Sequence, residues 1–170
     1  MPGNARPRKR YRPRVVDMDP VETVIARAGK LQGAQRSMLH GPLAQAFDGL
    51  RDGTGGWPAW CTLADGMNVA EKLAQAGIAS DRVPEIREAQ AALAAVHHRH
   101  QQGGSWTLRA SEMAALDFGL LLHQVQLDHC SQGELAEAIS TVMRCVQQAL
   151  AGNAPRDAMV CVGQLGQGRP

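Results

Sequence analysis

The residues of this chain best suited to bind a metal ion are the histidines of the stretch HHRH, namely His97, His98 and His100. His97 and His100 are three residues apart, so on a helix they would share a face, as zinc ligands often do. No carboxylate or cysteine near them in the sequence completes a ligand set, and the HExxH pattern is missing. The cluster precedes a Gly-Gly pair, where positive side chains complement the dipole of an ending helix. We therefore predict a surface cluster that binds no metal.

His123 is a second candidate, because it falls among apolar residues at helical spacing, with Leu120 before it and Leu127 after it. This position predicts a hydrogen-bonded histidine in the core or at its boundary. Asp128, His129 and Cys130 follow closely and could be imagined as further metal ligands. Helical geometry points such neighbours in different directions, so we expect no site there.

Motifs of enzymatic chemistry are missing. The chain has no GxSxG nucleophile motif, and its GTGG segment at 53–56 lacks the lysine of a phosphate-binding loop. Carboxylates three residues apart, Glu85 with Glu88 and Glu134 with Glu137, are typical of solvent-exposed helix faces. These observations predict a protein without enzymatic activity and without a cofactor.

Aromatic residues make up only 4% of the chain, which argues against a platform that stacks nucleic-acid bases. The three tryptophans, Trp57, Trp60 and Trp106, stand near the expected starts of helices. We expect them to close the ends of a helical bundle.

The four cysteines are far apart in the sequence and form no CxxC pair, which disfavours a zinc ribbon or a redox motif. No apolar signal-peptide region or membrane-length apolar run is present. We therefore expect reduced, partly buried thiols in a cytoplasmic protein. The cysteines are Cys61, Cys130, Cys145 and Cys161.

The most unusual segment is the basic stretch RPRKRYRPR, which spans residues 6–14. Residues 1–14 hold six cations and no acid, a charge of +6, whereas the rest of the chain has 12 cations and 16 acids, a charge of −4. Arginine grips phosphate oxygens with two hydrogen bonds, and a tyrosine can stack on a base or fill a protein pocket. We predict that this arm contacts nucleic acid or an acidic protein surface through Arg6, Arg8, Lys9, Arg10, Tyr11, Arg12 and Arg14.

Apolar residues recur at helical spacing through most of the remaining chain. In residues 38–50 the Gly41-Pro42 pair interrupts the pattern, so we expect either a kink or a helix that begins near Gly41. Ser131 and Glu134 form a capping box that begins the last helix. The expected helices span 19–30, 38–50, 58–76, 82–102, 110–130 and 131–150.

These helices are joined by short loops containing glycine, which predicts an all-α fold: a compact antiparallel bundle of five to six helices with an extended basic N-terminal arm. The expected organisation is an arm over 1–18, the bundle over 19–153 and a polar tail over 154–170, with a short extended piece at 159–162. The side chains expected to face the core in the second helix are Met38, Leu39, Leu43, Ala46, Phe47 and Leu50.

Several segments together resemble a family of small uncharacterised phage and prophage proteins of Proteobacteria. They are KRYRPR, DMDPVETVIARAGKL, LADGMNVAEKLAQAGI, GSWTLRASE and LLLHQVQL, and they cover most of the chain. The resemblance implies a continuous second helix, from which the Gly41-Pro42 pair of this chain departs. The resemblance implies an accessory protein of a mobile element that acts by binding inside a bacterial cell, and it supplies no catalytic residues.

Two functions remain open. The first is a phage accessory protein that binds nucleic acid or a nucleoprotein complex through the basic arm. The second is an anti-defence inhibitor, similar to an anti-CRISPR protein, that binds a host protein complex through the bundle. Sequence-specific DNA reading is disfavoured, because the helix after the short junction at 130–134 has Arg144 as its only cation. The oligomeric state is left open, a homodimer included.

Overall fold

A computed structural model of the protein describes residues 26–151. The predicted arm at 1–18, most of the first predicted helix at 19–30, and the predicted tail at 154–170 with its extended piece lie outside these residues. Within the described part, residues 26–28 are helical, and Lys30 pairs with Ser131 through a single antiparallel bridge. The N-terminal side of the described chain is therefore fixed beside the start of the last helix.

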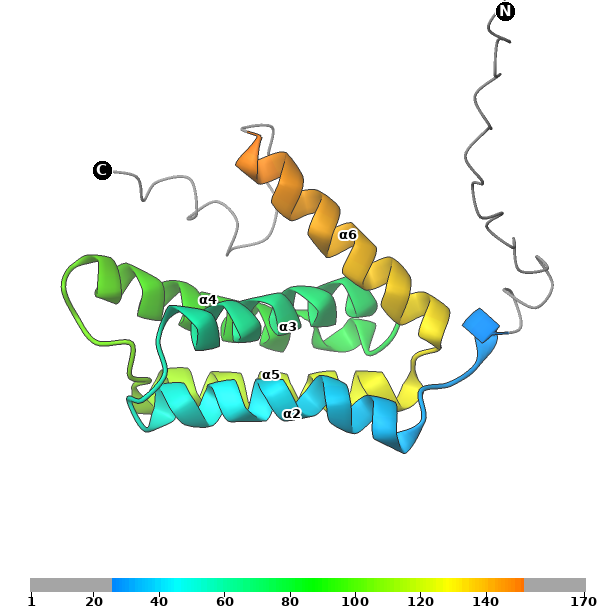
Figure 1. The fold of residues 1–170 in the computed structure, drawn as a ribbon, viewed down its shortest axis with the longest axis horizontal. Helices are drawn as coiled ribbons and strands as arrows, with labels where there is room; N and C mark the ends of the chain where they lie inside the picture. The colour runs from blue at the N-terminus through cyan, green and yellow to red at the C-terminus, as the bar shows by residue number, and fades with distance from the viewer. Residues whose placement is uncertain (1–25, 152–170) are drawn as a thin grey trace, which may run out of the picture.

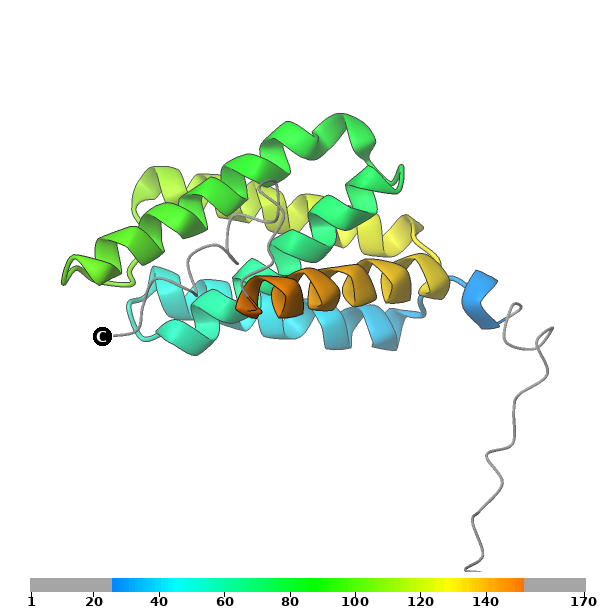
Figure 2. The same ribbon diagram turned by 90° about the horizontal axis from the view of Figure 1, so that it is seen from above.

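Four helices run up and down around a common core, and a fifth lies across the outside of this bundle (Figures 1 and 2). Helix α2 packs on α3 and α5, and α4 packs on α3 and α5, which closes the four-helix ring. Helix α6 packs mainly against α3. The expected all-α bundle is thus confirmed, with α2 Gly33–Arg51, α3 Trp57–Gln75, the 3-10 turn η1 Ser80–Arg82, α4 Val83–Gln101, α5 Ala110–His129 and α6 Gln132–Leu150.

The core is filled by the apolar stripes that the spacing predicts. Leu63 and Met67 of α3 pack with Leu93 of α4 and Leu116 of α5, all of them fully buried. Burial of side chains of this size stabilises the fold by about 1.5–3 kcal/mol each. A smaller apolar cluster around Leu73, Leu127, Cys130 and Leu135 joins α6 to the ends of α3 and α5.

Helix α2 begins earlier than the sequence indicated, and Pro42 lies inside it. The prediction of a helix that begins near Gly41 is therefore wrong. Pro42 is on the exposed face of α2, so the carbonyl that lacks a helical donor there can be hydrated. Met38 is also wrong as a core residue, because its side chain is 77% exposed. It lies five residues before the buried Leu43, which places it about 140° away around the helix.

The ends of the helices follow the expected chemistry. Gly77 stops α3 in a left-handed conformation (φ 105°), and the N–H of Ile78 donates to the carbonyl of Leu73 at 3.0 Å, as in a Schellman motif. At the start of α6, the N–H of Glu134 donates to Ser131 Oγ at 3.2 Å, and the N–H of Ser131 donates to the Glu134 carboxylate at 2.7 Å. The predicted capping box is confirmed.

One ion pair fixes the loop between α4 and α5. Arg99 donates to both carboxylate oxygens of Glu112, at 2.5 and 3.0 Å, and also to the carbonyl of Thr107 at 2.7 Å. Burial alone would raise the pKa of Glu112, but the hydrogen bonds from Arg99 and from the Arg109 N–H outweigh it and hold this pKa below its usual value. The pair therefore attaches the end of α4 to the start of α5.

Candidate functional site

The seven residues predicted to contact a partner, Arg6 to Arg14, lie outside the described residues. The described chain begins at residue 26, beside the start of α6. Gln132 at the start of α6 donates its N–H to the carbonyl of Gly29 at 2.9 Å, so the chain enters the bundle at the corner between α5 and α6.

Of the histidines of HHRH, His98 and His100 are exposed as predicted, whereas the prediction of a surface position is wrong for His97. Its side chain is buried against the stacked pair of Trp60, at a ring distance of 4.9 Å, and Trp57, at 5.6 Å. His97 lies four residues after the buried Leu93, on the inward face of α4, and this spacing decides its position. His100 instead stacks on Trp106 at 4.1 Å.

The tryptophans close one end of the bundle, as expected. Trp60 is almost fully buried, stacks on Trp57 at 5.0 Å, and donates its indole N–H to the carbonyl of Leu93 at 2.8 Å. Trp106 lies 6.2 Å from Trp60 and covers the cluster from the α4–α5 loop. The cluster joins the start of α3 to the end of α4.

The His, Cys, Asp and Glu side chains of residues 26–151 decide whether this part of the chain can bind a metal ion or carry a reactive thiol. No group of three or more His, Cys, Asp or Glu side chains in this range is arranged to hold a metal ion. Cys61, Cys130 and Cys145 are free thiols, and burial raises the pKa of Cys61 and of Cys130. A raised pKa lowers the fraction of reactive thiolate at neutral pH.

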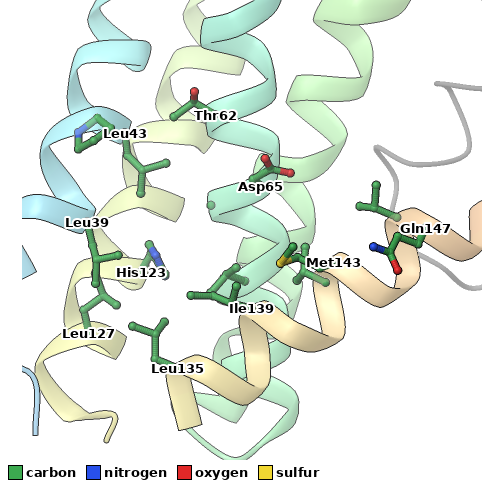
Figure 3. Close-up of a pocket in the computed structure, with 15 residues that line it drawn as sticks. Leu39, Leu43, Thr62, Asp65, His123, Leu127, Leu135, Ile139, Met143 and Gln147 are labelled. Carbon is green, nitrogen blue, oxygen red and sulfur yellow. The ribbon is translucent and has the colours of Figure 1, made fainter. Parts of the chain in front are cut away.

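The most apolar hollow among the described residues is a groove of about 460 Å³ beside α6 (Figure 3). We call it the α6 groove. Helices α2, α3 and α5 form its floor and one wall, and α6 forms the other wall. Its lining is mostly aliphatic, with Leu39, Leu43, Val69, Leu127, Leu135, Ile139, Val142, Met143 and Val146 among its residues.

The groove exists because α6 packs on α3 but does not close onto α2. Val142 of α6 is buried against Val69 of α3, whereas Met143, one residue further, is 58% exposed at the edge of the groove. Across the groove, Leu43 packs closely on Gly66 of α3, where an added Cβ would come within 2.5 Å of a Leu43 methyl group. The absence of a side chain at Gly66 therefore lets Leu43 pack directly against α3 at the floor of the groove.

Two ionisable side chains lie in this apolar lining. His123 is 4% exposed, and its Nδ1 has no hydrogen-bond partner. Burial lowers the pKa of His123 to about 4, and His40 acts in the same direction, while Gln126 offsets part of the change. At neutral pH the groove therefore presents an uncharged imidazole. The protein around its carboxylate also raises the pKa of Asp65, although the residue is exposed.

A shallower hollow between α2 and the start of α3 adjoins the groove and shares Pro42 and Thr62 with it. Its acidic residues are Asp48 and Asp52, both paired with Arg51. Together with Asp65, this side of the groove carries three carboxylates and one neighbouring guanidinium. An apolar site thus continues into a surface with negative charge.

Sequence reasoning missed the groove, although it identified much of the lining. Leu135, Ile139, Val142 and Val146 follow the helical spacing that predicts an inward face, and they do face inward. The spacing of apolar residues cannot show that α6 packs on α3 and leaves a groove open between itself and α2. His123 was predicted at the core and is buried there, and of its two ring nitrogens Nδ1 has no hydrogen-bond partner.

Comparisons with protein-family models, with curated proteins and with solved structures found no match for this chain. Among residues 26–151, no helix has the length and apolar character needed to cross a membrane.

Proposed function

We propose that the protein is a non-enzymatic binding module, and that its α6 groove takes an apolar segment of a protein partner that also carries one or two basic residues. The observation that supports this most is the apolar groove of about 460 Å³ that continues into a negatively charged hollow. Grooves of this kind receive the apolar face of a helix or an extended segment. The carboxylates of Asp48, Asp52 and Asp65 would then meet the basic side chains.

The resemblance implies a protein of a mobile element, and a host defence complex is a partner that fits this context. An inhibitor of a host defence complex would use such a groove to occupy a regulatory segment of one subunit. The bundle is poorly suited to imitate DNA, because the chain beyond residue 14 carries a charge of only −4. The proposal is therefore a module that masks or clamps a protein segment.

Selection of peptides from a random display library on the purified protein tests this function. We expect the selected peptides to share two or more large apolar residues followed by Arg or Lys, because the apolar groove runs into the acidic hollow. Library members without a basic residue should be depleted. A selection that yields acidic peptides, or no common pattern, would show that the groove does not bind in this way.

A second proposed function, contact with nucleic acid, rests on the distribution of charge. Of the ten cations in residues 26–151, five form ion pairs with carboxylates: Arg36, Arg51, Arg82, Arg87 and Arg99. The described part therefore offers little basic surface to a polyanion. The six cations of the arm are the part of the chain most suited to that contact.

Deletion of residues 1–14 should abolish binding to duplex DNA, single strands and RNA while leaving helix content and thermal melting nearly unchanged. If all six cations meet phosphates on a duplex, log affinity should fall with log salt at a slope of about −5. Fluorescence anisotropy across a salt series measures this slope, with the deleted chain as control. Equal affinity of the full-length and deleted proteins would refute the arm as the nucleic-acid contact.

A further inference from the structure

Helix α5 carries large apolar side chains on two opposite sides. On its inner side, Leu116 and Leu127 are almost fully buried. On its outer side, Phe118, Leu121 and Val125 are 43%, 54% and 41% exposed. An exposed apolar stripe on a surface helix indicates an interface. The outer side of α5 is therefore an uncovered packing face.

The spacing of this face is that of a helix-pairing seam. Ala114, Phe118, Leu121 and Val125 follow one another at intervals of four, three and four residues, which are the d and a positions of a heptad pattern. All four are exposed, and no charged residue interrupts them. Over these residues the seam is about 17 Å long at the rise of an α-helix. We call these four residues the α5 seam.

The α5 seam is complementary to itself when two copies run antiparallel. If the two-fold axis passes at the height of positions 119–120 along α5, Phe118 of one copy lies against Leu121 of the other. The same axis sets the small Ala114 against the larger Val125, so the four positions match in pairs along the helix. An isologous contact of this kind closes as a dimer and leaves no seam exposed.

The polar residues beside the seam favour the same arrangement. Asp117 and Gln124 are exposed and occupy the flanking g positions. In an antiparallel pair the g positions of the two helices face each other, so each Asp117 carboxylate can accept a hydrogen bond from a Gln124 amide. In a parallel pair, Asp117 would instead face the side of the other helix that holds Leu122, which is buried in its own bundle and offers no polar partner. Charge and polarity therefore select the antiparallel second copy as the occupant.

We propose that the protein forms a two-fold symmetric homodimer in which the α5 seams of two copies pack antiparallel. This dimer leaves the α6 groove open, because Leu121 and the groove-lining His123 point about 160° apart around α5. It therefore does not rest on the proposed function. A dimer would present two grooves and two basic arms to one partner assembly.

Sedimentation and light scattering of the full chain test the dimer. We expect a species of twice the 18.2 kDa chain mass, and we expect Leu121→Glu to convert it to a monomer of unchanged helix content. The matched control is Met143→Glu, at a side chain of similar exposure on α6, which should leave the dimer intact. A wild-type monomer at the highest soluble concentration, or a dimer that persists with Leu121→Glu, would overturn the proposal.

If Leu121→Glu fails to fold, milder substitutions at Gln124 and Asp117, which flank the α5 seam, test the dimer. Gln124→Glu places two like-charged pairs across the antiparallel interface and should weaken dimerisation about fivefold at low salt. Adding Asp117→Lys to it creates two opposite-charge pairs and should restore the dimer. If neither change alters the dissociation constant, the antiparallel packing of the α5 seams is wrong.

Discussion

Replacing Trp60 with alanine is expected to lower the free energy of unfolding by about 3–5 kcal/mol. The side chain is 2% exposed and touches Trp57, His97 and Trp106. Its removal would leave a large cavity where α3 meets α4 and would break the hydrogen bond to the Leu93 carbonyl. Trp60 thus connects α3 to α4 through both a ring contact with His97 and a buried hydrogen bond.

Denaturant unfolding followed by circular dichroism measures this loss without depending on tryptophan fluorescence. The matched control is Trp57→Ala, which removes the same side chain from a position that is 40% exposed and should cost about 1–2 kcal/mol. Equal losses for the two variants would mean that the aromatic cluster does not hold α3 to α4 through Trp60.

Acidification should remove about 3 kcal/mol of stability through His123 alone as the pH falls from about 6.5 to about 4. The pKa of His123 is lowered from 6.5 to about 4, chiefly because burial disfavours the imidazolium. Between these values the unfolded chain takes up a proton that the folded chain does not. Stability therefore rises with pH across this window and falls as the pH drops through it.

The variant His123→Leu isolates this effect from the carboxylates that also titrate in acid. Leucine fits the apolar lining and removes the unpartnered Nδ1, so stability at pH 7 should be equal to or above that of the wild type. Its stability should then change much less between pH 6.5 and pH 4. Parallel pH profiles for the two proteins would show that His123 titrates with an ordinary pKa.

Local chemistry was sufficient to predict most helices of the bundle. Glycine at Gly77 and the Ser131–Glu134 capping box fix where α3 ends and α6 begins, and these signals act within one turn of the chain. Pro42 led to a wrong predicted start for α2, because the cost of the backbone hydrogen bond that proline removes depends on solvent exposure. On the solvent face of α2, a missing backbone hydrogen bond costs little, so the helix continues through it.

The candidate site could not be predicted because its properties arise between helices. His97 resembled a surface histidine in the sequence HHRH, and its burial follows from the docking of α4 against three tryptophans. The α6 groove depends on the angle at which α6 crosses α3, which no spacing of apolar residues specifies. The arm was identified by charge alone, and its role stays a prediction.

The central claim, that the α6 groove binds a protein segment, is tested most directly by calorimetric titration of a display-selected peptide into three proteins. These are the wild type, Met143→Lys at the edge of the groove, and Met38→Lys, the same change at a side chain on α2 that is 77% exposed and outside the groove lining. Met143→Lys should weaken binding at least tenfold, or about 1.4 kcal/mol, because it removes apolar surface and repels the basic residue of the peptide. Met38→Lys should leave the affinity unchanged. Equal affinities for all three proteins, or equal losses for the two variants, would contradict binding in the α6 groove.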